Sequence, residues 1–304
     1  MNEAIKTLVP EAVYTDHREF IEYFYECALS APGRRAMSTV LLGQRRMGKT
    51  EIFKRVVNRL FYEQDHTDPD AVVPVYFSFP DKKANPKDFA LEYVENFIRW
   101  YAAFRLRRPD ILKKPETRDD LCHFIRQHLS MSEWFEHALR LLKAIEEGGV
   151  TLPDKRALTL PRTVSDWDES TIVMFLDEFQ NTRLPHYDFD IVGFMQDAVE
   201  SPSCPHFVTG SAMSILAKEI LGRGALFGRF DSEPIEAMTE YWGAELARRA
   251  VLHYQAELPD IVAPVVSLRC GGNPFYITEH SCRTGFATPS VTNTPAGRGL
   301  QPRP

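Results

Sequence analysis

The sequence has few cysteines and no long apolar run. Its five cysteines are scattered along 304 residues without a CxxC pair, which argues against a zinc site or a disulfide framework and favours buried thiols in a reducing compartment. No apolar stretch approaches the roughly 18 residues that a membrane-spanning helix needs. The N-terminal residues also lack the basic start and apolar core of a signal peptide. We therefore expect a soluble, cytoplasmic protein with no membrane partner.

An excess of positive charge is missing as well. The formal net charge is −6, which argues against the broad basic surface that proteins use on nucleic acid, although a local patch would be compatible with it. Apolar residues make up 44% and charged residues 26% of the chain, as in ordinary globular proteins. A nucleic-acid partner is therefore not supported by the composition.

Four short apolar runs and one further candidate strand alternate with segments of helical periodicity. This alternation is typical of βαβ units and predicts an α/β fold with a parallel sheet. The third run is apolar throughout, as in a central strand buried on both faces. Pro74, near the start of the second run, favours an edge strand or the first turn of a strand. The predicted strands are 38–42, 72–79, 171–176, 205–210 and about 232–237.

A large helical insertion, about 85–147, separates the second and third predicted strands. Asn85 is a candidate cap for a helix that begins at Pro86, which is the favoured first helical position for proline. The insertion provides either packing for the core or a surface for an unknown protein partner. Within and after it we expect helices at 116–129 and 132–147 and then a proline-containing loop at roughly 150–168.

The pattern changes near residue 236, where the strands stop. A long amphipathic helix is predicted from Thr239, a candidate N-cap, to Leu258, with a second helix at 260–269. The last residues contain prolines, no acid and no periodicity, so disorder is expected there. The predicted domains are an α/β core at 1–236, a truncated helical region at 237–282 and a tail at 283–304.

The motif GxxxxGK[ST] occupies residues 43–50, between a predicted strand and a predicted helix. Such glycines let the backbone N–H groups turn inward toward phosphates, and the following helix adds its positive end. Lys49 would bind the β- and γ-phosphates, and the Thr50 hydroxyl would bind Mg²⁺. The alternative is a plain glycine-rich turn. The predicted nucleotide-binding residues here are Gly43, Gln44, Arg45, Arg46, Met47, Gly48, Lys49, Thr50 and Glu51.

Two acids, Asp177 and Glu178, follow the third predicted strand. Ligands of open parallel sheets bind at the carboxyl ends of the strands. There Asp177 would hold Mg²⁺ through a water beside Thr50, and Glu178 would deprotonate the attacking water. The alternative is two surface acids that simply end a strand. A second acid of this kind is typical of ATPases in which water attacks, and neither the NKxD guanine motif nor the LSGGQ transporter signature is present.

Weaker candidates lie farther along the chain. Thr209 and Ser211 end the fourth predicted strand and could hydrogen-bond the γ-phosphate, or could be ordinary turn residues. Arg229 precedes the fifth predicted strand and could stabilise transition-state charge as an arginine finger, or could be a surface or salt-bridged arginine. Residues 271–275 form a turn followed by the start of a helix.

Several motifs together resemble those of archaeal-type P-loop ATPases of the STAND group in the AAA-like superfamily. They are GQRRMGKT, LDEFQ, FVTGSAMSIL, LFGRF and GGNPFYI, in that order, preceded at residues 14–19 by a stretch that looks like the family's N-terminal Arg-Glu motif. The resemblance covers roughly residues 12–280. It implies a three-layer α/β/α fold with a five-stranded parallel sheet in the order 5-1-4-3-2, followed by a helical lid.

The resemblance also implies roles for individual residues. Ser211 matches the family's sensor position, and Pro274 matches the proline that packs near the nucleotide base in the lid. Many members continue into a winged helix or another effector module, whereas this chain has only a short stretch after Ile277. Any function carried by such a module is therefore in doubt here.

These features favour a Mg²⁺-dependent ATP hydrolase that acts as a molecular switch, with ATP and Mg²⁺ as cofactors. The main alternative is a nucleotide-dependent, DNA-associated regulator or scaffold with little turnover. A P-loop kinase with a small acceptor is a third reading, for which no acceptor pocket is evident.

Overall fold

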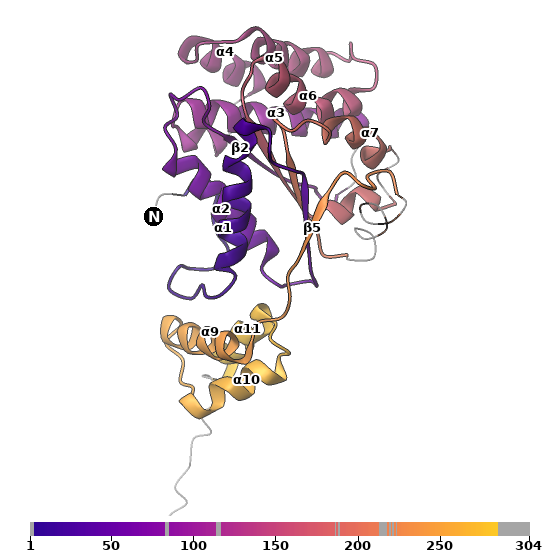
Figure 1. Cartoon of the computed structure of the whole chain (residues 1–304). Helices are drawn as coiled ribbons and strands as arrows, with labels where there is room; N and C mark the ends of the chain where they lie inside the picture. Colours follow the sequence, from indigo (N-terminus) through magenta and orange to yellow (C-terminus); the bar gives the residue numbers. More distant parts are fainter. Residues whose placement is uncertain are drawn as a thin grey trace, which may run out of the picture. The chain divides into compact units, whose positions relative to one another are not determined.

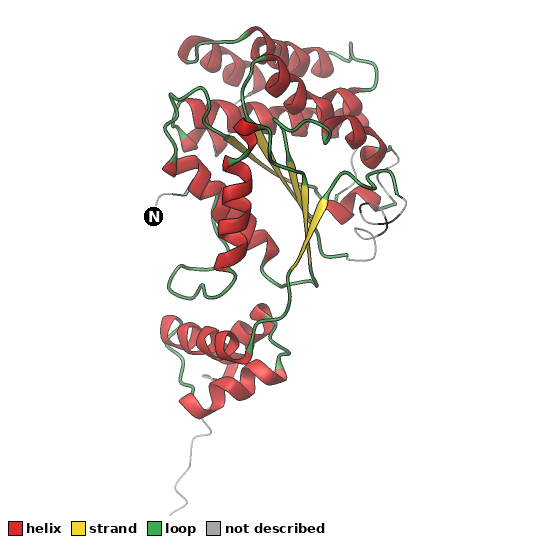
Figure 2. Cartoon of the chain, in the orientation of Figure 1, coloured by secondary structure: helices red, strands yellow, loops and turns green. Residues whose placement is uncertain are grey.

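The computed structural model describes residues 3–82, 85–113, 117–185, 187, 189–212, 218, 220, 222 and 224–284. The chain forms two compact units. The first comprises Met1–Glu11 and Thr15–Ala237, and the second comprises Ala12–Tyr14 and Met238–Pro304. The first unit holds the sheet, and the second is helical (Figures 1 and 2).

A five-stranded parallel sheet organises the first unit. The strands run in the order β2-β3-β4-β1-β5, which confirms the expected order 5-1-4-3-2. β2 lies at an edge, where the missing N–H of Pro74 costs least. All five predicted strands are present, with bounds that differ by a few residues. They are β1 (Thr39–Leu42), β2 (Val73–Ser78), β3 (Ile172–Asp177), β4 (His206–Thr209) and β5 (Asp231–Pro234).

Helices flank the sheet on both sides. On one side α2 packs against the sheet and α1 packs on α2, while α7 lies on the other side with α6 beside it (Figure 1). The helices are α1 (Arg18–Leu29), α2 (Lys49–Glu63), α3 (Pro86–Arg105), α4 (Arg118–His128), α5 (Glu133–Glu146), α6 (Pro153–Trp167) and α7 (Ile191–Ala198).

Edge-to-face aromatic contacts join the α1–α2 layer to the central strands. Phe24 of α1 lies 5.3 Å from Phe53 of α2 and 5.1 Å from Phe207 of β4, measured between ring centroids. Phe175 of β3 lies 5.4 Å from Phe53 and 5.2 Å from Phe207. All four rings are fully buried, so this cluster fixes α2, and with it the loop that precedes α2, against the sheet.

The insertion contains the predicted helices. The Asn85 side chain accepts a hydrogen bond from the Asp88 N–H, which confirms the predicted cap before Pro86. α3 packs on β2, α5 and α6 and buries most of its apolar side chains there. Packing therefore accounts for α3, and a protein partner on the insertion stays a prediction.

The loop predicted at about 150–168 is wrong, because α6 fills it. Pro153 stands in the first turn of α6, where proline is favoured, but Pro161 lies inside the helix and removes one backbone hydrogen bond. The helix buries apolar side chains along one face, and it packs on α3 and α7. That burial offsets the cost of about 3 kcal/mol for an internal proline.

The second unit contains α9 (Glu240–His253), a short 3₁₀ turn at Asp260–Val262, α10 (Ala263–Arg269) and α11 (Pro274–Thr284). Thr239 caps α9 as predicted, by accepting from the Trp242 N–H. The helix ends at His253 rather than Leu258, because Gln255 takes a left-handed conformation with φ 55°. The tail predicted at 283–304 begins inside α11, and residues 285–304 lie outside the described part of the chain.

Close packing holds the second unit together. A Cβ at Gly243 of α9 would lie 1.9 Å from Ser267 Oγ of α10, so only glycine fits at this helix contact. Arg249 of α9 donates to the Tyr14 carbonyl oxygen at 2.9 Å, which ties the segment Ala12–Tyr14 to this unit. Among the described helices of both units, none has the length and apolar character needed to cross a bilayer.

Candidate functional site

The loop between β1 and α2 has the backbone conformation that its glycines require. Gly48 has φ 89°, a left-handed value that glycine adopts at little cost. A Cβ on Gly43 would lie 2.2 Å from Ile235 Cγ2, so the chain after β5 leaves no room for a side chain there. The side chains of Gln44, Arg45 and Arg46 are exposed, whereas Met47 is buried.

The N-terminus of α2 offers backbone donors at the end of this loop. The Ile52 N–H bonds to the Gly48 carbonyl oxygen, so it belongs to the first closed turn of the helix. The N–H groups of residues 49–51 come before that turn and have no acceptor within the helix. Together with the helix dipole, they form a site suited to an anion such as phosphate.

Lys49 lies inside the loop with only 6% of its surface exposed. Its ammonium donates to the carbonyl oxygens of Gly43 at 2.7 Å and Gln44 at 2.6 Å, which uses two of its three donors. Burial lowers the pKa of Lys49 to about 8, and the nearby carboxylates of Asp177 and Glu178 oppose that shift. The group is therefore still mainly protonated at pH 7.

Asp177 ends β3 and is 3% exposed. Its carboxylate accepts from the Tyr76 hydroxyl at 2.7 Å and from the Glu178 N–H at 2.8 Å. The Thr50 hydroxyl also hydrogen-bonds to it. Burial raises the pKa of Asp177, and these three hydrogen bonds act in the opposite direction. The structure thus brings Thr50 and Asp177 into contact, as the sequence predicts.

These oxygen donors fit a magnesium ion. Mg²⁺ prefers hydroxyl and carboxylate oxygens, keeps several waters and is bound through one or two protein groups next to substrate phosphates. Thr50 and Asp177 offer one oxygen ligand each, directly beside the phosphate loop. They are the residues that would hold the ion.

Glu178 follows Asp177 in a left-handed conformation, φ 54°, and begins a 3₁₀ turn, η3 (Phe179–Arg183). Its carboxylate accepts a hydrogen bond from the Gln180 side-chain amide. The Oε1 atom of Gln180 accepts from the Ser211 N–H at 2.9 Å. Ser211 therefore lies beside the acidic pair, as predicted, but the contact runs through its backbone.

Two polar residues of this site, Tyr76 and Gln180, were not predicted from the sequence. Gln180 lies within the quoted motif LDEFQ, so its position was visible although its role was not. Tyr76 reaches Asp177 across the β2–β3 register, in which Ser78 and not Tyr76 lies opposite Asp177. Only the pairing of the two strands reveals that contact.

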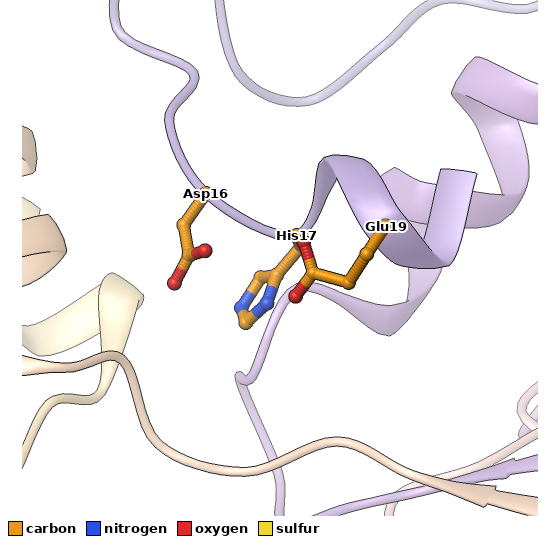
Figure 3. Close-up of side chains that lie close together, drawn as sticks. All are labelled: Asp16, His17 and Glu19. Carbon is orange, nitrogen blue, oxygen red and sulfur yellow. The ribbon is translucent and has the colours of Figure 1, made fainter. Parts of the chain in front are cut away.

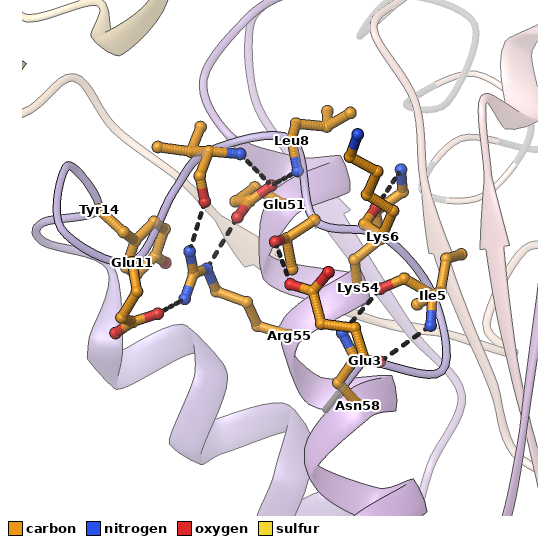
Figure 4. Close-up of polar contacts among 12 residues, drawn as sticks. Glu3, Ile5, Lys6, Leu8, Glu11, Tyr14, Glu51, Lys54, Arg55 and Asn58 are labelled. Carbon is orange, nitrogen blue, oxygen red and sulfur yellow. Dashed lines mark hydrogen bonds and ion pairs between the residues drawn. The ribbon is translucent and has the colours of Figure 1, made fainter. Parts of the chain in front are cut away.

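The side chains of Glu51 and Thr209 bind other parts of the protein. The carboxylate of Glu51 turns away from the loop: it accepts from the N–H groups of Leu8 at 2.7 Å and Val9 at 3.3 Å and pairs with Arg55 (Figure 4). Its backbone N–H remains for a phosphate, so nucleotide binding by Glu51 stays a prediction that concerns the backbone. The Thr209 hydroxyl donates to the Leu41 carbonyl oxygen at 3.2 Å, as an ordinary buried threonine does.

Arg229 lies at the opposite end of the sheet. β1 and β5 are parallel, with Thr39 opposite Asp231, so Arg229 precedes the amino end of β5 while the phosphate loop follows the carboxyl end of β1. The separation is on the order of 15–20 Å, beyond the reach of an arginine side chain. Arg229 instead pairs with Glu200 at 2.9 Å. A catalytic role for it would require a second copy of the chain.

Pro274 begins α11 in the second unit, whereas the phosphate loop belongs to the first. Its predicted place near the nucleotide base therefore stays a prediction.

A further polar cluster, Asp16, His17 and Glu19, lies beside the phosphate loop at the start of α1 (Figure 3). His17 is 5% exposed, and its Cδ2 lies 3.8 Å from the position of a Cβ on Gly48. Its Nε2 has no hydrogen-bond partner among the described residues, and burial lowers the pKa of the imidazole. Ligand atoms of the three side chains lie within 4.8 Å of one another, so the group could hold a cation. This cluster was not predicted from the sequence.

Comparison with known proteins finds likeness in solved structures only. No protein-family model matches the chain, and no curated protein sequence matches it. The Walker-type ATPase PABY2304 of Pyrococcus abyssi superposes with a TM-score of 0.54 at 14% identity, over 91% of this chain and 69% of that one. This chain has a P-loop NTPase-like α/β fold. At such low identity the likeness concerns the fold alone.

A second structure, the ORC2 protein of Aeropyrum pernix in ADPNP-ADP complexes, gives a TM-score of 0.43 at 13% identity, over 96% of this chain and 74% of that one. This value is too low to support a conclusion. The resemblance to archaeal P-loop ATPases thus holds at the level of the fold, and the STAND subtype stays a prediction.

Proposed function

We propose that the chain is a magnesium-dependent ATPase that works as a nucleotide-driven molecular switch. The observation that carries this proposal is the contact of Thr50, at the start of α2, with Asp177, at the end of β3. Lys49 lies close enough for the carboxylates of Asp177 and Glu178 to oppose the lowering of its pKa. A phosphate-binding group and a hydrolytic group from distant parts of the chain therefore meet at the carboxyl end of the sheet, where such sheets bind ligands.

In the reaction, the loop and Lys49 bind the phosphates of ATP. The N–H groups at the start of α2 and the Lys49 ammonium donate to the β- and γ-phosphate oxygens. Thr50 and Asp177 would hold a magnesium ion, which would neutralise charge on these phosphates. Glu178 accepts a proton from water as the water oxygen bonds to the γ-phosphorus and the bond to the β–γ bridging oxygen breaks. ADP and inorganic phosphate leave, and Glu178 returns its proton to solvent.

The proposed switch acts on the second unit. This unit is compact on its own and follows directly after β5, the strand whose end packs on Gly43 of the loop. We infer that the state of the nucleotide is passed to the second unit along this connection. Pro274 at the start of α11 is the predicted contact to the base, as in the lids of the family that the sequence resembles.

The test is the release of phosphate by the purified chain with MgATP. Glu178→Gln keeps the shape of the side chain but cannot accept a proton, so turnover should fall by about 10²–10⁴-fold while ATP still binds. Product analysis should show ADP and free phosphate. A phosphorylated acceptor would favour a kinase, and unchanged turnover in Glu178→Gln would contradict the proposed mechanism.

A further inference from the structure

The Gln180 side chain connects two strand ends at the proposed active site. Its Nε2 donates to the Glu178 carboxylate after β3, and its Oε1 accepts from the Ser211 N–H after β4 at 2.9 Å. Chemistry fixes the orientation of this amide. A flipped amide would place NH₂ against the N–H of Ser211 and a carbonyl oxygen against a carboxylate, so both hydrogen bonds would be lost.

The backbone around Gln180 is held on both sides. Phe179 is 1% exposed, and its ring lies 5.6 Å from that of Phe79. The Asn181 N–H bonds to the Glu178 carbonyl oxygen at 2.9 Å, and its side-chain amide donates to the Phe79 carbonyl oxygen at 2.8 Å. Gln180 therefore projects its amide from a short turn that is anchored to the chain following β2.

A general base needs one carboxylate oxygen for the proton and a fixed direction for that oxygen. Gln180 bonds to Oε2 of Glu178, which leaves Oε1 for water. We propose that Gln180 is a positioning residue for hydrolysis, which rests on the proposed function: it aims the Glu178 carboxylate at the attacking water, and its own orientation is set by the Ser211 backbone.

A positioning role can be distinguished from simple structural support by its effect on the rate of hydrolysis. Loss of the amide should slow the chemical step on bound ATP, because the Glu178 carboxylate is no longer held in one direction. The groups that bind ATP in the proposed function stay in place, so ATP affinity should change little.

The experiment compares two variants with a matched control. Gln180→Met keeps the approximate volume and removes the side-chain hydrogen bonds of Gln180, including a longer one of 3.4 Å from Nε2 to Asn181 Oδ1. Gln180→Glu keeps the shape but places a second carboxylate against Glu178. The control is Gln64→Met, because Gln64 also bridges two elements: its amide donates to the carbonyl oxygens of Leu60 and Val72 and accepts from the Val72 N–H, at the amino end of β2. Single-turnover hydrolysis, ATP affinity and thermal stability are measured for each.

In Gln180→Met we expect the single-turnover rate to fall about tenfold to a hundredfold with ATP affinity within about twofold of wild type. Gln180→Glu should slow the reaction at least as much, because its carboxylate cannot donate to Glu178 and repels it. Gln64→Met should lose thermal stability but keep the wild-type single-turnover rate.

A wild-type single-turnover rate in either Gln180 variant would overturn the positioning role. So would a loss of ATP affinity as large as the loss of rate, or a larger loss of stability than in Gln64→Met, because that pattern describes structural support. If wild type and Glu178→Gln hydrolyse ATP equally, the proposed function is wrong, and the positioning role of Gln180 is wrong with it.

Discussion

At the carboxyl ends of the strands, Lys49 and Asp177 are almost fully buried and share their surroundings with Glu178 and the N-terminus of α2. At the amino end of β5, Arg229 and Glu200 form an ion pair with 31% and 48% of their side chains exposed. Both ends of the sheet therefore carry opposite charges close to one another. The two ends differ in how deeply the charged side chains are buried and in whether backbone N–H donors are present. These two properties decide whether charged side chains form a binding site or an ordinary surface ion pair.

The largest effect should come from removing the buried ammonium. In Lys49→Ala, ATP affinity should fall about 100-fold or more, because charge-assisted hydrogen bonds to phosphate are lost. Calorimetric titration with MgATP measures this. The control is Lys54→Ala on the same helix, where the ammonium donates to the Lys6 carbonyl oxygen in an exposed position. Equal affinities in the two variants would remove Lys49 from the site.

The same residue predicts how binding depends on pH. Burial places the pKa of Lys49 at about 8, well below the value of an unfolded lysine. Above that pH the free protein loses the proton, whereas the phosphate-bound form retains it, so binding takes up a proton and affinity falls by up to about tenfold per pH unit. Titrations at pH 7 and pH 9 in buffers of different ionisation enthalpy measure the uptake. Pronounced uptake in Lys49→Arg at pH 9 would assign it to another group.

A smaller effect is expected at the edge strand. Tyr76→Phe removes the hydroxyl that orients the Asp177 carboxylate, so the Mg²⁺ dependence of turnover should shift to about tenfold higher concentration. Tyr93→Phe is the control, because the Tyr93 hydroxyl is buried and has no hydrogen-bond partner among the described residues. A shift of equal size in both variants would show that the Tyr76 hydroxyl has no particular role.

Glu51→Ala should affect stability only. Its buried carboxylate anchors Leu8 and Val9 to α2, so the free energy of unfolding should fall by about 1–3 kcal/mol while turnover per folded molecule stays the same. Glu63→Ala, on the same helix in an exposed pair with Arg59, should cost well under about 1 kcal/mol. Reduced turnover at unchanged stability would show that the Glu51 side chain takes part in nucleotide binding.

Features that depend on the spacing of residues close together in the sequence could be predicted. The loop at residues 43–50 and the acid at the end of β3 follow from patterns within a few residues, and the strand order followed from a resemblance and is confirmed. The contacts of Tyr76 and Glu51 depend on strand register and on a segment without periodicity, which no local pattern encodes. α6 was not predicted, because a proline such as Pro161 usually breaks a helix. In the structure, burial of α6 against α3 and α7 stabilises the helix.

The most direct test compares one residue from each end of the sheet. Phosphate release from MgATP is measured for wild type, Glu178→Gln and Arg229→Ala at several protein concentrations. The account predicts that Glu178→Gln loses about 10²–10⁴-fold in turnover at every concentration, while Arg229→Ala matches wild type at the lowest concentration and loses less than about 1 kcal/mol of stability. Equal turnover in Glu178→Gln and wild type, or an equal loss in both variants at the lowest concentration, would contradict it.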